Sequence, residues 1–209
     1  MNQSKIFAVF LIIFFSEYLF GQQVFECYLP INIENRQSWE TVHLTSIGQF
    51  GVMRNARPNV PAHHHTGIDF KRPNDNYENE PIFPIMHGII ISFRDDGPFA
   101  QIIIEHNNEN QNTVWSVYEH VAGISVSVGD FVNPNYSIAR FMNKNELEQY
   151  GWQFDHLHFE ILKIKPRHLK PNKKIPFRFF GTYCLECYDI SDLDKYYYNP
   201  MEYFKNWVH

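Results

Sequence analysis

The clearest strand pattern in the chain is the stretch His156-Leu-His-Phe-Glu-Ile-Leu162. Side chains two apart on a β-strand point to the same face, so we expect His156 and His158 to lie side by side. The intervening Leu157 and Phe159 are then turned into the core. Two imidazoles that share a face can bind one metal ion together. Alternatively, one binds the metal while the other contacts a bound water or substrate.

Short apolar runs of strand length precede this stretch and are separated by Gly, Pro, Asn and Asp turn signals. The runs cover residues 67–70, 88–93, 100–105 and 114–118, where β-branched or aromatic residues dominate. Residues 95–97 and 107–110 have the composition of hairpin connections. Residues 143–150 alone have the pattern of a helical turn or two. The sequence therefore predicts a mainly antiparallel β domain over residues 48–163.

Two further stretches concentrate metal-binding side chains: His63-His-His65-Thr-Gly-Ile-Asp69 and Tyr118-Glu-His120. If the first is extended, His65 and Asp69 share a face, and the glycine between them allows a close approach of the backbone. One imidazole from each of two strands plus one carboxylate is a three-ligand zinc set that leaves the fourth position open to water. Zinc fits these donors best, although ligand softness also admits other transition metals. Each motif alone is a weak signal, and their co-occurrence carries the prediction.

Six motifs follow one another through residues 48–162, a little over half of the chain. They are Phe50-Gly-Val-Met-Arg54, His65-Thr-Gly-Ile-Asp69-Phe, Pro84-Ile-Met-His-Gly88-Ile-Ile, Tyr118-Glu-His120, Val126-Ser-Val-Gly-Asp130-Phe-Val and His156-Leu-His158-Phe-Glu160-Ile. Together they resemble, with high specificity, the lysostaphin-type or LytM-like zinc endopeptidases that cut peptidoglycan cross-bridges. The sequence departs from the family pattern at Asp155, where Pro is more common, and at Asn133-Pro-Asn135, which replaces a Gly-containing turn. These departures leave the substrate preference open.

The resemblance implies a ligand set of His65, Asp69 and His158 for one Zn²⁺ ion, with His120 and His156 as catalytic residues. It also implies a compact antiparallel β sheet or sandwich of the duplicated-hybrid-motif type, with a narrow groove that contains the metal. We prefer His156 as the general base and give His120 contact with the developing oxyanion or a share in proton transfer. The assignment between these two histidines stays open.

The resemblance further implies a secreted zinc metalloendopeptidase that hydrolyses peptide bonds in peptidoglycan cross-bridges or stem peptides. The first alternative is a catalytically idle relative that binds cell wall or activates an amidase. The second is a non-enzymatic metal-binding or carbohydrate-binding β module. The net charge of −5 gives no basic footprint, so nucleic acid is not expected as a partner. The peptidoglycan peptide is the expected partner, and we expect a monomer.

The remaining segments flank or follow this domain. Residues 1–21, with Lys5 ahead of an apolar run over residues 6–15, are predicted to be a secretory signal peptide; an uncleaved anchor is the alternative. We therefore expect export to the periplasm or the extracellular space, without stable membrane insertion after cleavage. Residues 22–47 form an N-terminal lead-in. Residues 164–197 form a basic, Pro-rich insertion with a Cys pair, and residues 198–209 a tail that packs on the domain.

Three cysteines and two other histidines complete the sequence predictions. A structural disulfide, either local or through Cys27, is preferred for Cys184 and Cys187 over a zinc or redox site. His87 and His106 are interpreted as ordinary surface or hairpin histidines.

Overall fold

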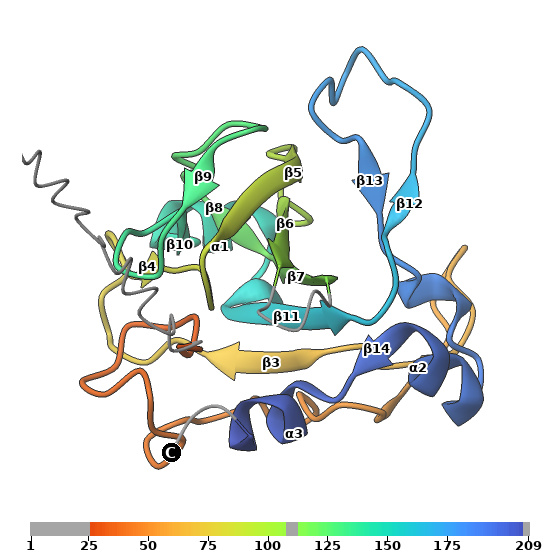
Figure 1. Ribbon diagram of the computed structural model, residues 1–209, viewed down its shortest axis with the longest axis horizontal. Coiled ribbons are helices and arrows are strands. Elements are labelled where there is room, and N and C mark those ends of the chain that lie inside the picture. The colour runs from red at the N-terminus through yellow and green to blue at the C-terminus, as the bar shows by residue number, and fades with distance from the viewer. Residues whose placement is uncertain (1–25, 108–112, 207–209) are drawn as a thin grey trace, which may run out of the picture.

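The computed structural model describes residues 26–107 and 113–206. Within these residues the centre of the fold is an antiparallel sheet of seven strands (Figure 1). In sheet order the strands are β14 (Tyr197–Tyr198), β11 (His156–Leu162), β7 (Thr113–Glu119), β6 (Gln101–Asn107), β5 (Gly88–Arg94) and β9 (Phe131–Val132), and β3 (Ile68–Lys71) also pairs with β11. The predicted mainly antiparallel β class is confirmed, and each strand-length run of the sequence lies in one of these strands.

Smaller elements surround the sheet. The short strands are β1 (Met53–Arg54) with β2 (His63–His64), β4 (Pro81–Ile82) with β10 (Ala139–Phe141) and β8 (Val121–Ala122), and β12 (Arg167–His168) with β13 (Phe180–Gly181). The helices are α1 (Lys144–Tyr150), α2 (Ile190–Tyr196) and α3 (Pro200–Lys205), with 3₁₀ turns η1 (Trp152–Phe154) and η2 (Cys184–Glu186). Helix α1 occupies the predicted helical stretch and begins with a capping box between Asn143 and Glu146.

Alternate residues of β11 point to opposite faces of the sheet, as period-2 geometry requires. Leu157, Phe159 and Ile161 are fully buried in the larger hydrophobic core, so the prediction that Leu157 and Phe159 face the core is confirmed. His156, His158 and Glu160 consequently point to the other face, which holds the polar site.

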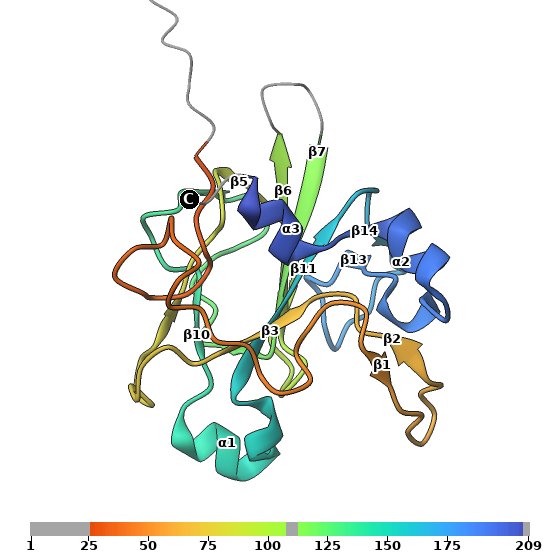
Figure 2. The same cartoon turned by 90° about the horizontal axis from the view of Figure 1, so that it is seen from below.

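A second core covers part of that other face. The sheet contributes one set of apolar side chains, and the segment after β11 contributes the rest. The members are Ile103, Trp115, Val117 and Leu162 from the sheet, and Cys187, Leu193 and Tyr197 from the following segment. In Figure 2 the segment with β13, α2 and β14 lies on the opposite side of β11 from β10. Residues 180–197 therefore pack against the sheet face that also carries His158.

The described ends of the chain add to the larger core. Phe204 of α3 stacks on Phe159 with ring centroids 5.6 Å apart, and it also meets the edge of Phe70. Near the other end, Ile31 is buried and forms an isolated bridge with Ile82. Both ends thus stabilise the face of the sheet that lies behind the polar site.

Two interpretations from the sequence are wrong in the structure. His106 is fully buried, and Ser116 and the carbonyl oxygen of His87 provide hydrogen-bond partners for its two ring nitrogens. It lies in the β6–β7 hairpin opposite Val114, but it is not at the surface. All three cysteines are free thiols, so the expected disulfide is not formed.

The predicted signal peptide lies outside the described residues. In the part of the chain that is described, no helix has the length and apolar character needed to cross a membrane.

Candidate metal centre

Strand register brings Asp69 and His158 together. In the pairing of β3 with β11, Asp69 lies directly opposite His158, and cross-strand neighbours project from the same face. Gly67 allows the approach, since a Cβ at that position would lie 2.2 Å from the carbonyl oxygen of Phe159. Because residue 67 has no side chain, the backbone passes close to β11, and His65 reaches Asp69 and His158 from the segment before β3.

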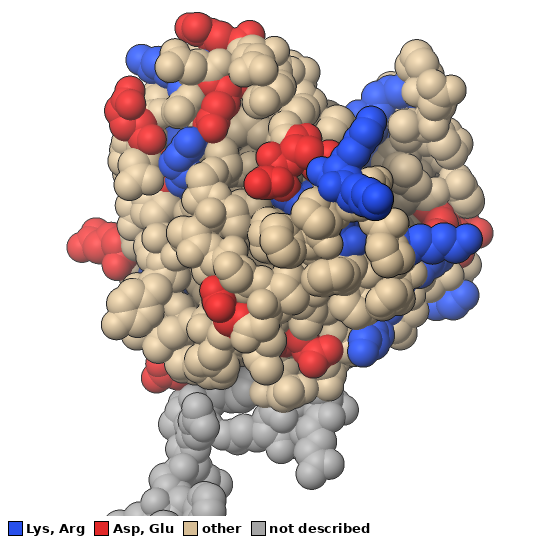
Figure 3. Space-filling model, turned by 90° about the horizontal axis from the view of Figure 1, so that it is seen from above, with Lys and Arg blue, Asp and Glu red and all other residues tan. Residues whose placement is uncertain are grey.

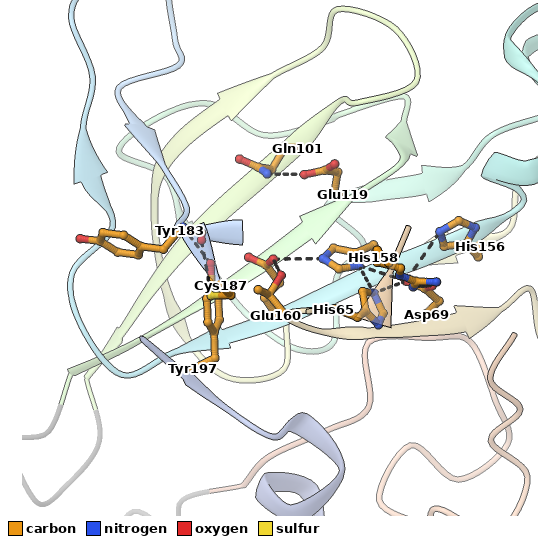
Figure 4. A network of polar contacts seen from close by, with 12 residues as sticks. His65, Asp69, Gln101, Glu119, His156, His158, Glu160, Tyr183, Cys187 and Tyr197 are labelled. Carbon is orange, nitrogen blue, oxygen red and sulfur yellow. Dashed lines mark hydrogen bonds and ion pairs between the residues drawn. The ribbon is translucent and has the colours of Figure 1, made fainter. Parts of the chain in front are cut away.

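His65, Asp69 and His158 direct three ligand atoms to one point (Figure 4). The Nε2 atom of His65 lies 2.9 Å from Nδ1 of His158 and 3.0 Å from Oδ1 of Asp69. Nδ1 of His158 lies 3.0 Å from the same carboxylate oxygen. Within residues 26–107 and 113–206, this is the one group of His, Cys, Asp or Glu side chains arranged to hold a metal ion.

The outer nitrogen of each of these imidazoles already has a partner. Nδ1 of His65 lies 2.9 Å from the carbonyl oxygen of Gln49, and Nε2 of His158 lies 3.1 Å from Oε1 of Glu160. A carbonyl or carboxylate oxygen can only accept a hydrogen bond, so in the neutral rings the outer nitrogens carry the protons. The inner lone pairs and the Asp69 carboxylate then converge. This set of acceptors needs a cation, and mixed His and carboxylate donors suit zinc.

The pKa shifts of the three groups agree with this requirement, because a proton on an inner nitrogen supplies the positive charge that a metal ion would otherwise supply. Burial alone would raise the pKa of Asp69, but hydrogen bonds from His158 and His65 hold that pKa far below its ordinary value. Burial alone would lower the pKa of His158, yet its hydrogen bonds with Asp69 and Glu160 raise it to about 10. Burial lowers the pKa of His65. The carboxylate is therefore ionised, and the site favours one or more positive charges beside it.

Arg54 and Glu160 hold two of the ligand side chains from outside. The Nη2 atom of Arg54 donates to Oδ2 of Asp69 at 2.7 Å, which leaves Oδ1 to face the two imidazoles. Glu160 is buried, and its Oε1 atom also accepts a hydrogen bond from the Thr66 hydroxyl at 2.5 Å. Outer partners of this kind orient ligands and tune their basicity.

His120 and His156 stand beside the three-residue group. His120 follows β7 with a φ of 65°, a left-handed conformation that few non-glycine residues adopt. Its ring centroid lies 4.8 Å from that of His156 and 6.3 Å from that of His158. The Nδ1 atom of His120 lies 2.6 Å from the carbonyl oxygen of Pro98.

His156 lies between His120 and the carboxylate. Its Nε2 atom is 3.7 Å from Oδ1 of Asp69. Burial lowers the pKa of both His120 and His156, and the neighbouring His120 helps to bring the pKa of His156 down to about 3. The structure thus brings all five site residues predicted from the sequence into one cluster, while their roles as ligands and catalytic groups stay predictions.

Several contributors to the site had no assigned role at the sequence level. Arg54 stood in a family-like motif, but its distance from Asp69 depends on how β1 and β3 pack. The carbonyl oxygens of Gln49 and Pro98 hold two of the imidazoles, and a backbone atom leaves no mark on the sequence. Thr66 was detectable only as a neighbour of His65.

Residues 63–171 match the model of peptidase family M23. This match spans more than half of the chain and includes all five residues of the cluster. The chain therefore belongs to peptidase family M23, a family of metallopeptidases.

Solved structures that match the chain share little sequence with it. A complex of SpoIIIAH and SpoIIQ matches at 20% identity and a TM-score of 0.45, covering 66% of this chain and 92% of that one. A zinc-containing peptidase from Vibrio cholerae matches at 23% identity and 0.45, covering 66% and 36%. Lysostaphin matches at 17% identity and 0.48, covering 89% and 56%. No curated protein matches the chain.

Proposed function

We propose that this protein is an exported, zinc-dependent endopeptidase that hydrolyses peptide bonds in peptidoglycan cross-bridges or stem peptides. His65, Asp69 and His158 would hold the zinc ion, and His120 and His156 would act on the substrate and the attacking water. The observation that carries the proposal is the convergence of three acceptor atoms at 2.9–3.0 Å, each imidazole being fixed by a partner on its outer nitrogen.

Zinc in such a three-ligand site supplies two kinds of chemistry, since it lowers the pKa of water from 15.7 to about 7 and polarises a carbonyl group as a Lewis acid. The protein's own part is to position groups that move protons. The two histidines beside the ligands can do so at neutral pH because burial keeps both rings neutral.

His120 is the residue that we propose accepts the proton of the attacking water. Its Nδ1 lies against the carbonyl oxygen of Pro98, so that nitrogen carries the proton of the neutral ring and Nε2 is left as the acceptor. This hydrogen bond favours His120 as the base, which reverses the preference for His156 drawn from the sequence. His156, whose Nε2 faces the Asp69 side of the site, would donate a hydrogen bond to the developing oxyanion.

The experiment combines metal analysis with identification of the products. Purified peptidoglycan is treated with the wild type and with His158→Ala, His120→Ala and His156→Ala, and the released fragments are identified by mass spectrometry with and without a chelator. We expect His158→Ala to lose both zinc and activity. The other two variants should keep zinc and lose about 10²–10⁴-fold in turnover. The exposed His87 gives a matched control, and His87→Ala should behave as the wild type.

The outcomes separate the proposal from its alternatives. Stoichiometric zinc in His158→Ala would refute the ligand assignment. A wild type that holds zinc and sediments with the wall but releases no fragment would identify a catalytically idle wall-binding protein. The pH profile tests the base, because solvent hydroxide replaces a missing base as pH rises. His120→Ala should therefore recover activity at high pH more than His156→Ala.

A further inference from the structure

Positive charge is concentrated in one segment of an otherwise acidic chain. Residues 163–178, called the basic arm, contain seven of the 18 Lys and Arg residues and none of the 23 Asp and Glu residues. The rest of the chain therefore carries 11 basic against 23 acidic side chains. Figure 3 shows most of the visible Lys and Arg on the right, where the arm lies, and most of the visible Asp and Glu elsewhere. Such segregation creates a local positive field despite the net charge of −5.

The arm is a fixed projection. In Figure 1 the β12–β13 hairpin rises away from the rest of the fold. Pairing of Arg167 with Gly181 and a backbone hydrogen bond from Leu169 to Phe179 close its base. Pro171 and Pro176 restrict the backbone of the loop. The cations are thus presented on a braced loop.

The base of the arm is attached to the sheet face that carries the metal centre. The hydroxyl of Ser92 on β5 accepts hydrogen bonds from the backbone N–H groups of Phe179 and Phe180, and Phe177 stacks on Phe93 with centroids 5.0 Å apart. Register across β5, β6, β7 and β11 places Ser92 and Glu160 in one row on one face. Three strand spacings separate them, which is about 14 Å. The base of the arm and the metal centre therefore lie on the same face of the sheet, so one extended polymer can reach both.

The cations at the tip are available, whereas those at the base are partly engaged. Arg167 pairs with Glu186 at 2.6 Å, and Lys163 donates to the carbonyl oxygen of Asp194. Lys170, Lys173 and Lys174 are exposed and form no ion pair with any residue that the structure describes. Three unpaired ammonium groups within five residues form a compact cationic surface at the end of the arm.

We propose that the basic arm is a second binding site, outside the catalytic centre, for carboxylates of the polymer whose peptides the active site cleaves. The proposal rests on the proposed function. A peptide polymer carries carboxylates at its chain ends and on acidic side chains, and these groups match the ammonium groups of the tip. Contact at two points of one polymer raises the effective concentration of cleavable bonds at the metal centre without any new contact there.

The test measures binding of the full chain to purified, insoluble peptidoglycan by sedimentation. A His120→Ala background keeps the polymer intact. Lys170→Gln, Lys173→Gln and Lys174→Gln are combined in the tip variant. The matched control combines Lys144→Gln, Lys195→Gln and Lys205→Gln, which are also exposed and remove the same charge.

At low ionic strength we expect the tip variant to bind at least about tenfold more weakly than its parent, because each cation near a dense anionic surface contributes several-fold. The control should stay within about twofold, and the difference should vanish at high salt. Amidation of the polymer carboxylates should abolish the contribution of the tip. Acid removal of phosphodiester-linked polymers should leave it unchanged. With histidine restored at residue 120, cleavage of a short uncharged peptide should be the same with and without the tip lysines.

Three results would overturn the proposal. These are equal losses in the tip and control variants, a difference between parent and tip variant that persists after amidation, and a difference that disappears when the phosphodiester polymers are removed. If the wild type cleaves no peptide at all, the proposed function fails, and the binding data still report on the arm independently.

Discussion

Replacing Glu160 by Gln should weaken zinc binding without unfolding the protein. Oε1 of Glu160 accepts from Nε2 of His158 at 3.1 Å and from the Thr66 hydroxyl at 2.5 Å, and the side chain is 2% exposed. The Oε2 atom has no hydrogen-bond partner among the described residues, so an amide nitrogen in its place breaks no bond. Glu160→Gln therefore keeps the acceptor for His158 and removes the charge.

The expected loss of zinc affinity follows from the hydrogen bond between His158 and Glu160, which is no longer charge-assisted in Glu160→Gln. A charge-assisted hydrogen bond stabilises by about 1.5–3 kcal/mol, roughly twice as much as a neutral one. Loss of about half of that, about 0.75–1.5 kcal/mol, corresponds to about a 4- to 13-fold rise in the Kd for zinc. Loss of the whole partner in Glu160→Ala should approach 100-fold, within the range known for outer partners of metal ligands.

The assay is competition for zinc against a chromophoric chelator, with thermal unfolding of the metal-free protein measured in parallel. Glu80 supplies the control. It is also buried, also has one carboxylate oxygen without a partner, and bonds to Asn74 rather than to a site residue. We expect Glu80→Gln to keep the wild-type zinc Kd. Equal zinc affinity in Glu160→Gln and Glu80→Gln would refute the argument that Glu160 positions His158.

Two further predictions concern the fold. Gly67→Ala places a Cβ 2.2 Å from the Phe159 carbonyl oxygen and should lower the free energy of unfolding by denaturant by about 3 kcal/mol or more. In Gly129→Ala the new Cβ meets nothing within 4 Å, so the φ of 93° alone should cost about 1–2 kcal/mol. Similar costs at both positions would contradict the packing argument. Burial lowers the pKa of His106 to about 4 from 6.5, so in this window the unfolded chain binds a proton that the native chain does not, and stability falls as pH falls. The wild type should lose up to about 3 kcal/mol from this residue between pH 6.5 and 4. His106→Asn should lose less in thermal unfolding over the same range, and identical pH slopes would argue against the shift.

Much of the fold could be predicted because its strands carry local signals. The alternation in β11 assigned Leu157 and Phe159 to the core, and the turn signals separated the strands correctly. The second core could not be predicted. Ile103 and Val117 meet Leu193 and Tyr197 only after the segment beyond β11 has folded back on the sheet, and no local pattern encodes such packing between distant segments.

The candidate metal centre was likewise predictable only in part. Spacing predicted that His156 and His158 share a face, but the opposition of Asp69 and His158 depends on register between two strands. The left-handed backbone of His120 was not visible either, since neither its neighbours nor its type required a positive φ. Histidine tautomers are set by partners such as the Pro98 carbonyl, so the proposal of His120 as the base rests on three-dimensional information.

Strand β11 supplies side chains of the candidate metal centre and of the larger core from alternate positions of one seven-residue segment. A slip of a single residue against β3 or β7 would carry imidazoles into the apolar interior and leucine and phenylalanine into the site. Selection for activity and selection for solubility therefore act on the same register. In a misaligned chain the candidate metal centre and the apolar core would therefore be lost together.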